Sequence, residues 1–125
     1  MKLIIAGSRD IDDKHVCKLI DLALEDAPFE VTEVVSGAAR GVDREGERWA
    51  EQRGIPVKRF PADWAVLGRS AGIQRNLEMA RYGDALIAIW DGKSRGTAHM
   101  IDTMNRVGKY VKVIEVRSAT PHTTP

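Results

Sequence analysis

The sequence predicts an α/β protein: a three-layer, Rossmann-like fold in which helices cover both faces of a mainly parallel, five-stranded sheet. Apolar runs alternate with stretches of helical periodicity along almost the whole chain, which is the order expected of β–α–β units. Some runs have no polar face, as in Ala85–Ile89, and such runs are typical of strands buried between two layers of helices. Because parallel crossovers are right-handed, few topologies remain, and we favour the one in which the first strand is central.

Two strands and two helices are expected in the first half of the chain. Asp12 is a candidate N-cap for the first helix, and Gly54 is placed to end the second. Within that second helix, Val42, Trp49 and Ala50 share the inward face. The expected ranges, alternating strand and helix, are Lys2–Gly7, Asp12–Asp26, Glu30–Ser36 and Val42–Gly54.

The second half continues the alternation with three strands and two helices. Ile73, Leu77 and Ala80 mark the inward positions of one helix, and Ile101 and Met104 those of the other. The expected strands are Ile55–Phe60, Asp84–Gly92 and Lys109–Val116. The expected helices are Ser70–Gly83 and Gly96–Gly108.

Length and composition limit the class of protein. The 125 residues, 43% hydrophobic and 30% charged, suit one soluble globular domain. We assign residues 1–116 to this domain and 117–125, which lack any period, to a flexible C-terminal tail. Lys plus Arg number 19 against 18 for Asp plus Glu, so there is no overall basic excess to indicate wholesale nucleic-acid binding. No segment resembles a signal or a membrane span, which favours the cytoplasm.

The first glycine-rich turn, "VVSGAARGVDREGERWA", follows the second strand and runs directly into a helix. Gly37 and Gly41 lack a Cβ, so backbone amides there can approach an anion and can adopt positive φ. The helix start adds its dipole, and Arg40 a guanidinium. The alternative is a plain tight turn with Arg40 in solvent. Asp43 could bind a ribose hydroxyl or simply stabilise the helix N-terminus.

A second turn of the same kind, "DGKSRGTAH", follows the fourth strand. Thr97 could bind a phosphate or cap the helix. Between the two turns in sequence, Trp64 is expected in a loop, where it could stack on a base or cover the sheet edge. Arg75 and Asn76 lie partly off the apolar face of their helix, so they could point into a cleft or into solvent.

Ligands of open parallel sheets bind beyond the carboxyl ends of the strands, and the candidate binding residues gather there. Cys17 is interpreted as a packing residue, and with one cysteine no internal disulfide forms. His15, His99 and His122 show no metal-ligand spacing, so we predict no metal and no cofactor and assign no catalytic residue. The candidate ligand-binding residues are Gly7, Ser8, Arg9, Ser36, Gly37, Ala38, Arg40, Gly41, Asp43, Trp64, Arg75, Asn76, Asp91, Gly92, Ser94, Gly96 and Thr97.

These segments together resemble the SLOG superfamily. "SGAARGVD" is similar to a motif of the Smf/DprA DNA-processing proteins, and "QRNLEMA" to an Arg-Asn segment of theirs and to a helix of the Lonely-guy (LOG) phosphoribohydrolases. "DGKSRGTAHM" resembles the Gly-Thr turn that both share. The whole pattern, from about Lys2 to Val116, is most similar to small stand-alone YspA-type SLOG proteins.

The resemblance implies a Rossmann-like domain that binds a nucleotide or nucleotide-derived small ligand, and a sensor is one role that such a domain could have. Two alternatives stay open: a LOG-like N-glycosidase and a DprA-like nucleic-acid-binding protein. Met100 stands where LOG enzymes carry a catalytic glutamate, so hydrolysis would need Asp43 or Asp102 instead. For nucleic acid, Arg9, Arg40, Arg75 and Arg95 would contact phosphates.

The resemblance and the apolar surface of two helices together predict a homodimer. The helix Ser70–Tyr82 carries more apolar residues than one sheet contact requires, and Met100 adds to Ile101 and Met104 on the next helix. Excess apolar area of this kind usually marks an interface, most often a two-fold one. The alternative is a monomer in which Met79 and Met100 fill gaps in the core. No membrane partner is expected.

Overall fold

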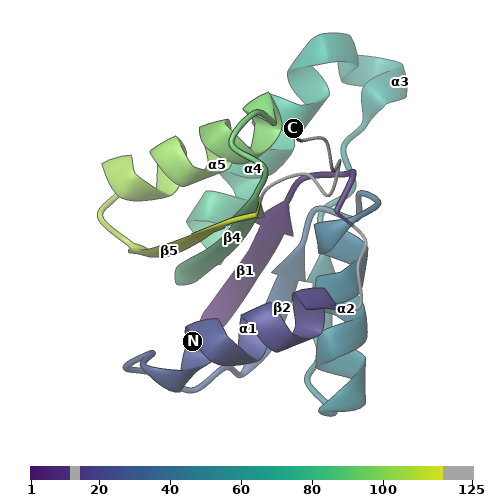
Figure 1. Ribbon diagram of the computed structural model, residues 1–125. Coiled ribbons are helices and arrows are strands. Elements are labelled where there is room, and N and C mark those ends of the chain that lie inside the picture. The colour runs from purple at the N-terminus through teal and green to yellow at the C-terminus, as the bar shows by residue number, and fades with distance from the viewer. Residues whose placement is uncertain (12–14, 117–125) are drawn as a thin grey trace, which may run out of the picture.

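A computed structural model describes residues 1–11 and 15–116 and confirms the predicted fold class (Figure 1). Five strands form one open sheet in the order β3-β2-β1-β4-β5, and every pairing is parallel. The first strand is therefore central, as expected. The strands are β1 (Lys2–Gly7), β2 (Glu33–Ser36), β3 (Val57–Arg59), β4 (Ala85–Trp90) and β5 (Tyr110–Glu115).

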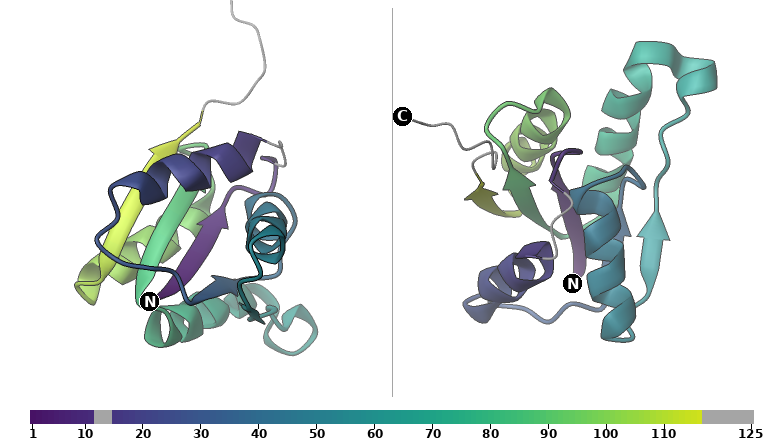
Figure 2. Two further views of the ribbon diagram at one scale, coloured as in Figure 1. Left: turned by 90° about the horizontal axis from the view of Figure 1, so that it is seen from below. Right: turned by 45° about the vertical axis from the view of Figure 1, so that its right-hand side comes forward.

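Helices cover both faces of this sheet, so the domain has three layers (Figure 2). α1 and α2 pack together on one face, and α4 and α5 on the other. A short helix, α3, and a 3-10 turn, η1, precede α4 and lie beyond the carboxyl ends of β1 and β2 (Figure 1). The helices are α1 (His15–Glu25), α2 (Val42–Gln52), α3 (Trp64–Leu67), η1 (Gly68–Ser70), α4 (Ala71–Tyr82) and α5 (Arg95–Arg106).

The structure differs from the sequence prediction mainly between residues 55 and 70. β3 begins at Val57 rather than at Ile55, because Pro56 has no N–H and contributes only its carbonyl, which accepts from the Val34 N–H at 2.9 Å. Trp64 does not lie in a loop but begins α3. The carboxylate of Asp63 caps this helix by accepting from the Val66 N–H at 3.2 Å. The candidate N-cap Asp12 and the tail 117–125 fall outside the described residues.

Two apolar clusters hold the layers together, one on each face of the sheet. β4 is the most buried strand, and every residue of Ala85–Ile89 is fully buried. Met79, Met100 and Met104 belong to the α4–α5 cluster and are at most 1% exposed. Met79 and Met100 therefore lie in the core of the single chain, so they are not available as a surface for a second copy. Ile73, by contrast, is 49% exposed. In the described part of the chain no helix is long and apolar enough to cross a membrane.

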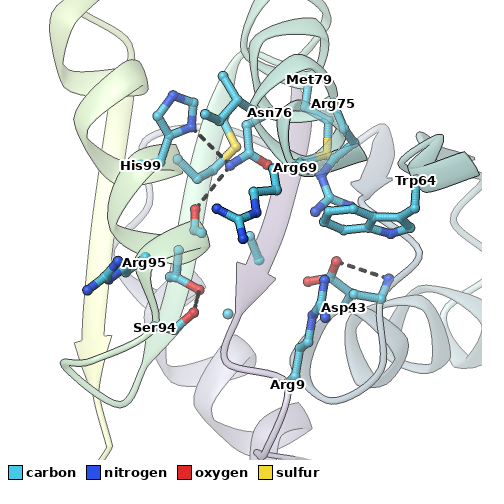
Figure 3. A pocket seen from close by; sticks show the side chains of 18 residues that line it. Arg9, Asp43, Trp64, Arg69, Arg75, Asn76, Met79, Ser94, Arg95 and His99 are labelled. Atoms are coloured by element: carbon cyan, nitrogen blue, oxygen red, sulfur yellow. Dashed lines mark hydrogen bonds between the residues drawn. The ribbon is translucent and has the colours of Figure 1, made fainter. Parts of the chain in front are cut away.

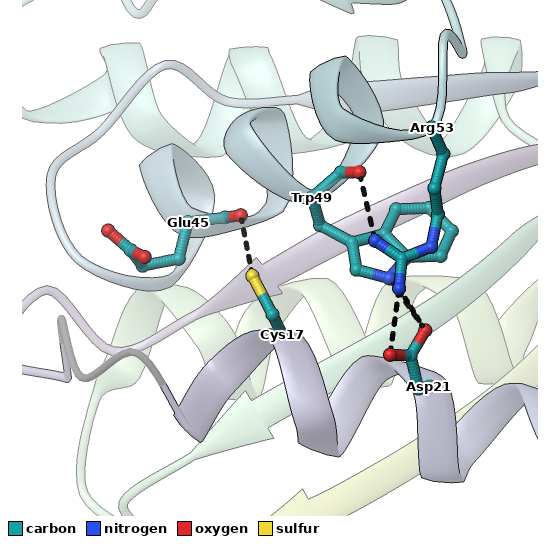
Figure 4. Close-up of polar contacts among 5 residues, drawn as sticks. All are labelled: Cys17, Asp21, Glu45, Trp49 and Arg53. Carbon is teal, nitrogen blue, oxygen red and sulfur yellow. Dashed lines mark hydrogen bonds and ion pairs between the residues drawn. The ribbon is translucent and has the colours of Figure 1, made fainter.

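Polar contacts join α1 to α2 on the outer side of their packing (Figure 4). Arg53 donates two 2.8 Å hydrogen bonds to the carboxylate of Asp21, and the Trp49 indole N–H donates to the same carboxylate at 2.9 Å. Cys17 is half-buried between the helices and its thiol faces the Glu45 carbonyl at 4.0 Å. Burial, and then the charge of Glu45, raise the pKa of the Cys17 thiol, which suits a packing residue better than a nucleophile.

Replacing Gly41 with alanine should cost more stability than the same replacement at Gly54. Both glycines have positive φ, 79° and 68°, so each variant pays about 1 to 2 kcal/mol for left-handed backbone. At Gly41 the added Cβ would also lie 2.5 Å from the carbonyl oxygens of Ser8 and Arg9, whereas nothing lies within 4 Å at Gly54. Urea unfolding should show an extra loss of about 1 to 3 kcal/mol at Gly41, and equal losses would contradict this packing.

Candidate functional site

A cleft lies beyond the carboxyl ends of β1 and β4, where the strand order reverses and where such sheets bind ligands. Its volume is about 420 Å³, and its walls come from the turn after β1, from α3 to α4, and from the start of α5 (Figure 3). It is lined by Ala6, Gly7, Arg9, Ala39, Asp43, Trp64, Arg69, Gly72, Ile73, Arg75, Asn76, Met79, Ser94, Arg95, Gly96, Thr97, His99 and Met100.

The charge of the cleft is strongly positive. Arg9, Arg69, Arg75 and Arg95 line it, and Asp43 is the one carboxylate among the described lining residues. The whole chain carries a formal net charge of only +1. Four arginines and one carboxylate thus give the cleft an excess of positive charge that the chain as a whole lacks, which is the arrangement expected of a site for an anion.

Arg75 and Asn76 join the two glycine-rich turns across the cleft. Arg75 donates from Nη1 to the carbonyl of Gly37 at 2.5 Å, and from Nε to Oδ1 of Asn76 at 3.0 Å. The amide of Asn76 donates to the carbonyl of Gly96 at 3.0 Å and lies 3.1 Å from Nδ1 of His99. Two adjacent residues of α4 thus fix both turns at once, and both point into the cleft rather than into solvent (Figure 3).

The first turn uses its backbone amides internally. The Ala38 N–H donates to Oγ of Ser36 at 3.0 Å, and the Ala39 N–H donates to the carboxylate of Asp43 at 3.3 Å. Ala38 has a φ of 60°, and in the described chain no other residue except glycine has positive φ. These two amides are engaged before any ligand arrives, so the turn offers an anion its neighbouring arginines rather than a ring of unpaired N–H groups.

Asp43 is buried against this turn, with a residue exposure of 5%. Its burial raises the pKa of the carboxyl group to about 6, against the lowering influence of Arg75 and of the Ala39 and Gly7 amides. A Cβ at Gly37 would stand 2.6 Å from Arg75 Nη1 and 2.7 Å from Asp43 Oδ2. Because Gly37 has no side chain, the Asp43 carboxylate and the Arg75 guanidinium can occupy the space beside it.

The second turn presents the start of α5 to the cleft. Asp91 shapes the turn, because its Oδ1 accepts from the N–H groups of Lys93 and Ser94, both at 2.8 Å. These bonds hold the pKa of Asp91 below its ordinary value. Ser94 makes no side-chain capping bond to α5, and the first turn of α5 contains no acidic residue. The first N–H groups of α5 therefore receive no capping bond from the Ser94 side chain. Gly96 and Thr97, at this helix start, form part of the cleft wall.

Trp64 separates this cleft from a second hollow of about 380 Å³. The indole is half exposed, and the Arg9 guanidinium lies 5.6 Å from its ring centroid. Arg9, Trp64 and Arg75 line both spaces, and Arg40 lines only the second, where it pairs with Asp10 at 3.4 Å. An exposed aromatic face between arginines is a suitable surface for a planar ring.

The structure brings most of the predicted binding residues together. Nine line the cleft: Gly7, Arg9, Asp43, Trp64, Arg75, Asn76, Ser94, Gly96 and Thr97. Three more line the second hollow: Gly37, Ala38 and Arg40. Five line neither space: Ser8, Ser36, Gly41, Asp91 and Gly92.

Those five residues have evident structural contacts instead. Ser8 is 1% exposed, and its Oγ accepts from the Asp91 N–H at 3.0 Å while its carbonyl accepts from the Val42 N–H at 3.4 Å. Ser36 Oγ donates to the carboxylate of Glu47 at 2.7 Å. Gly92 adopts a φ of 81° beside the side chain of Glu115. These contacts hold the loops that carry the cleft.

Sequence reasoning missed Arg69 and His99 as cleft residues. Arg69 lies in η1, which the sequence prediction did not include, and the Asp63 cap and Gly68 were the available signals. His99 follows Gly96 by three positions on α5, so both share one helix face. Arg95 and Met100 also line the cleft. Among residues 1–11 and 15–116, no cluster of three or more His, Cys, Asp or Glu side chains could hold a metal ion.

Fold and cleft together define an α/β domain with an arginine-lined cavity at the carboxyl edge of its sheet. Residues 1–66 match the model of a family described as the YspA, cpYpsA-related SLOG family. The chain is also 36% identical over 114 residues to the Gene 61 protein of Mycobacterium phage D29, covering 86% of this chain and 90% of that protein. No solved structure gives a significant match. The chain belongs to the YspA, cpYpsA-related SLOG family, which confirms the resemblance seen in its motifs.

Asp43 should make the protein less stable as pH rises from about 4 to about 6. Its folded pKa of about 6 exceeds the ordinary value of 3.8, so over this interval the folded state binds a proton that the unfolded chain releases. The contribution is fully present below the unfolded pKa and is lost above the folded one, and it amounts to about 3 kcal/mol at most.

Urea unfolding of the native protein and of the Asp43→Asn variant at both ends of this pH range tests the point. The unfolding free energy of the native protein minus that of Asp43→Asn should fall by up to about 3 kcal/mol as pH rises, because asparagine does not titrate. Asp26→Asn, at a carboxylate 80% exposed, is the matched control and should show no such trend. A pH-independent difference between native protein and Asp43→Asn would contradict the raised pKa.

Proposed function

We propose that this protein is a cytoplasmic binding module that holds a nucleotide or a nucleotide-derived small ligand in the cleft. The observation that carries the proposal is the combination in one cavity of four arginines and an exposed tryptophan face. Guanidinium groups suit phosphate oxygens, and an indole suits the flat face of a base. Membership of a SLOG family supports the same ligand class.

The start of α5 is the better place for the phosphate. α2 also begins at a glycine turn, but its first turn already contains Asp43 and Glu45, so negative charge there is supplied by the chain itself. α5 has no acid in its first turn and begins with Arg95. An anion at this helix start would meet both the positive end of the helix dipole and the arginines of the cleft.

Calorimetric titration with AMP and with adenosine tests the proposal. AMP should bind and adenosine should bind more weakly, because the phosphate contacts the arginines. Arg95→Gln should weaken AMP binding about tenfold or more, since a charge-assisted contact is lost. Arg106→Gln, at the other end of the same helix and 77% exposed, is the matched control and should change little. Equal AMP affinity in both variants would contradict a phosphate site at α5.

Trp64 should contribute to nucleotide binding but not to binding of inorganic phosphate. The Trp64→Ala variant is expected to bind AMP about tenfold more weakly, because stacking on one base is worth about 1 to 3 kcal/mol. Its affinity for inorganic phosphate should be unchanged. Val107→Ala, at an apolar residue 54% exposed at the end of α5 and outside the cleft lining, serves as control. A parallel loss for both ligands would show that Trp64 acts through the fold and not through a base.

The same titrations separate the proposal from the two alternatives. Free base in the AMP mixture, detected by chromatography, would favour the N-glycosidase. Met100 cannot act as a catalytic acid, because its side chain is a thioether buried in the cleft wall. The N-glycosidase activity would therefore need an acid at another position. Much tighter binding of single-stranded oligonucleotide than of AMP, falling steeply with salt, would favour the nucleic-acid-binding protein.

A homodimer remains part of the proposal. With Met79 and Met100 in the core, the surface we propose for a partner is the group of exposed apolar side chains on α3 and at the start of α4. These are Trp64, Val66, Leu67 and Ile73. Trp64 and Ile73 line the cleft, so a second copy seated on this surface would also cover part of the binding site.

A further inference from the structure

Asp43 is an unexpected residue in a cavity suited to anions. Its carboxylate is buried and is the one acid among described lining residues that include four arginines. A ligand phosphate would bring a second negative charge into the same cleft. Two negative charges repel each other strongly at short range when one of them is buried, unless one is neutralised.

The groups that face Asp43 come from several elements. Arg75 from α4 is its main charged partner, Glu47 lies on its own helix, and the Ala39 and Gly7 amides hydrogen-bond to it. Arg9 and His99 line the same cleft from the turn after β1 and from α5. Arg75 is thus shared: it donates to the Gly37 carbonyl, interacts with Asp43, and is open to both hollows.

We propose that Asp43 couples anion binding to proton uptake: when an anion enters the cleft and takes Arg75 as its partner, the Asp43 carboxylate becomes protonated. The inference rests on the proposed function, because it concerns the same cleft. The proton comes from solvent and is carried on the carboxyl group, and no covalent bond other than this O–H is formed. The cleft then selects ligands by charge, and it binds anions more tightly under mildly acidic conditions.

The physical basis is competition for one guanidinium. In the free protein Arg75 lowers the pKa of Asp43 against the larger effect of burial, and the balance stands at about 6. An anion that draws charge from Arg75 removes part of this lowering and adds repulsion, and both changes raise the pKa of the carboxyl group further. Near neutral pH the free protein holds Asp43 mostly ionised, so binding must add a proton. The two groups lie close together beside Gly37, because a Cβ at this position would stand 2.6 Å from Arg75 Nη1 and 2.7 Å from Asp43 Oδ2.

Calorimetric titration with sodium sulfate is the test, because sulfate carries no titrating proton at these pH values. Measured near pH 7 in two buffers of different ionisation enthalpy, the apparent binding enthalpy reports the protons taken up. The native protein should take up a proton, and its affinity for sulfate should rise by up to about tenfold per pH unit as pH falls toward 6. Asp43→Asn should take up none and should bind sulfate with little dependence on pH.

His99→Gln is the matched control, because it replaces another polar side chain that lines the same cleft. If Asp43 takes up the proton, His99→Gln keeps the uptake and Asp43→Asn loses it. The reverse pattern, or uptake by neither, overturns the inference. Should Asp43→Asn fail to fold, the carbon-13 signal of the Asp43 carboxyl group in the native protein gives the same answer: its titration midpoint should move to higher pH when sulfate is added, and an unmoved midpoint overturns the inference.

The outcomes separate the two proposals. Sulfate and AMP binding without proton uptake leaves the proposed function standing and removes the role of Asp43. Binding of AMP without any binding of sulfate also removes that role, because the coupling requires recognition of charge alone. Failure of both ligands to bind at any pH between about 5 and 8 removes the proposed function and the inference with it.

Discussion

The contact on which the cleft depends is the one that Arg75 makes with the first glycine-rich turn. Its guanidinium donates to the Gly37 carbonyl and faces the buried Asp43, while Asn76 beside it reaches the carbonyl of Gly96. These turns follow β2 and β4, which lie on either side of β1 in the sheet. A single helix segment therefore sets the spacing of two loops that no strand pairing connects. The arrangement is costly in isolation, because a buried acid and a half-buried guanidinium must each lose water.

That cost explains how the remaining polar groups are arranged. Asp43 keeps hydrogen bonds from the turn itself, and Ser36 satisfies both Ala38 and Glu47. The two glycines leave space for different groups. A side chain at Gly37 would meet Asp43 and Arg75, whereas one at Gly41 would meet the backbone carbonyls that follow β1. Arg75 is held in place by its own hydrogen bonds before any ligand arrives, so this guanidinium is preorganised. Asp43, the one carboxylate among the described lining residues, offsets part of the repulsion between Arg9 and Arg75.

The two ends of the cleft differ in electrostatic character for a local reason. α2 contains acids in its first turn and α5 does not. The positive end of the α2 dipole is therefore balanced by the chain itself, whereas that of α5 remains available to an anion. Trp64, on a helix of only four residues, provides a flat apolar surface at the rim. The chain belongs to the YspA, cpYpsA-related SLOG family.

Local pattern in the sequence was sufficient to determine the fold: unbroken apolar runs such as Ala85–Ile89 can be buried only inside a covered sheet, and alternation with helices makes that sheet parallel. It also located the cleft, since glycine turns after strands mark the carboxyl edge. Only the tertiary structure decided which residues of those turns face the cavity. Ser8 and Gly41 have the same residue types as ligand-binding positions, yet they contact backbone from distant elements, and Arg69 and His99 reach the cleft through η1 and α5. The physical reason is that periodicity depends on neighbours along the chain, whereas the partner of a hydrogen-bonding group depends on which segments packing brings together.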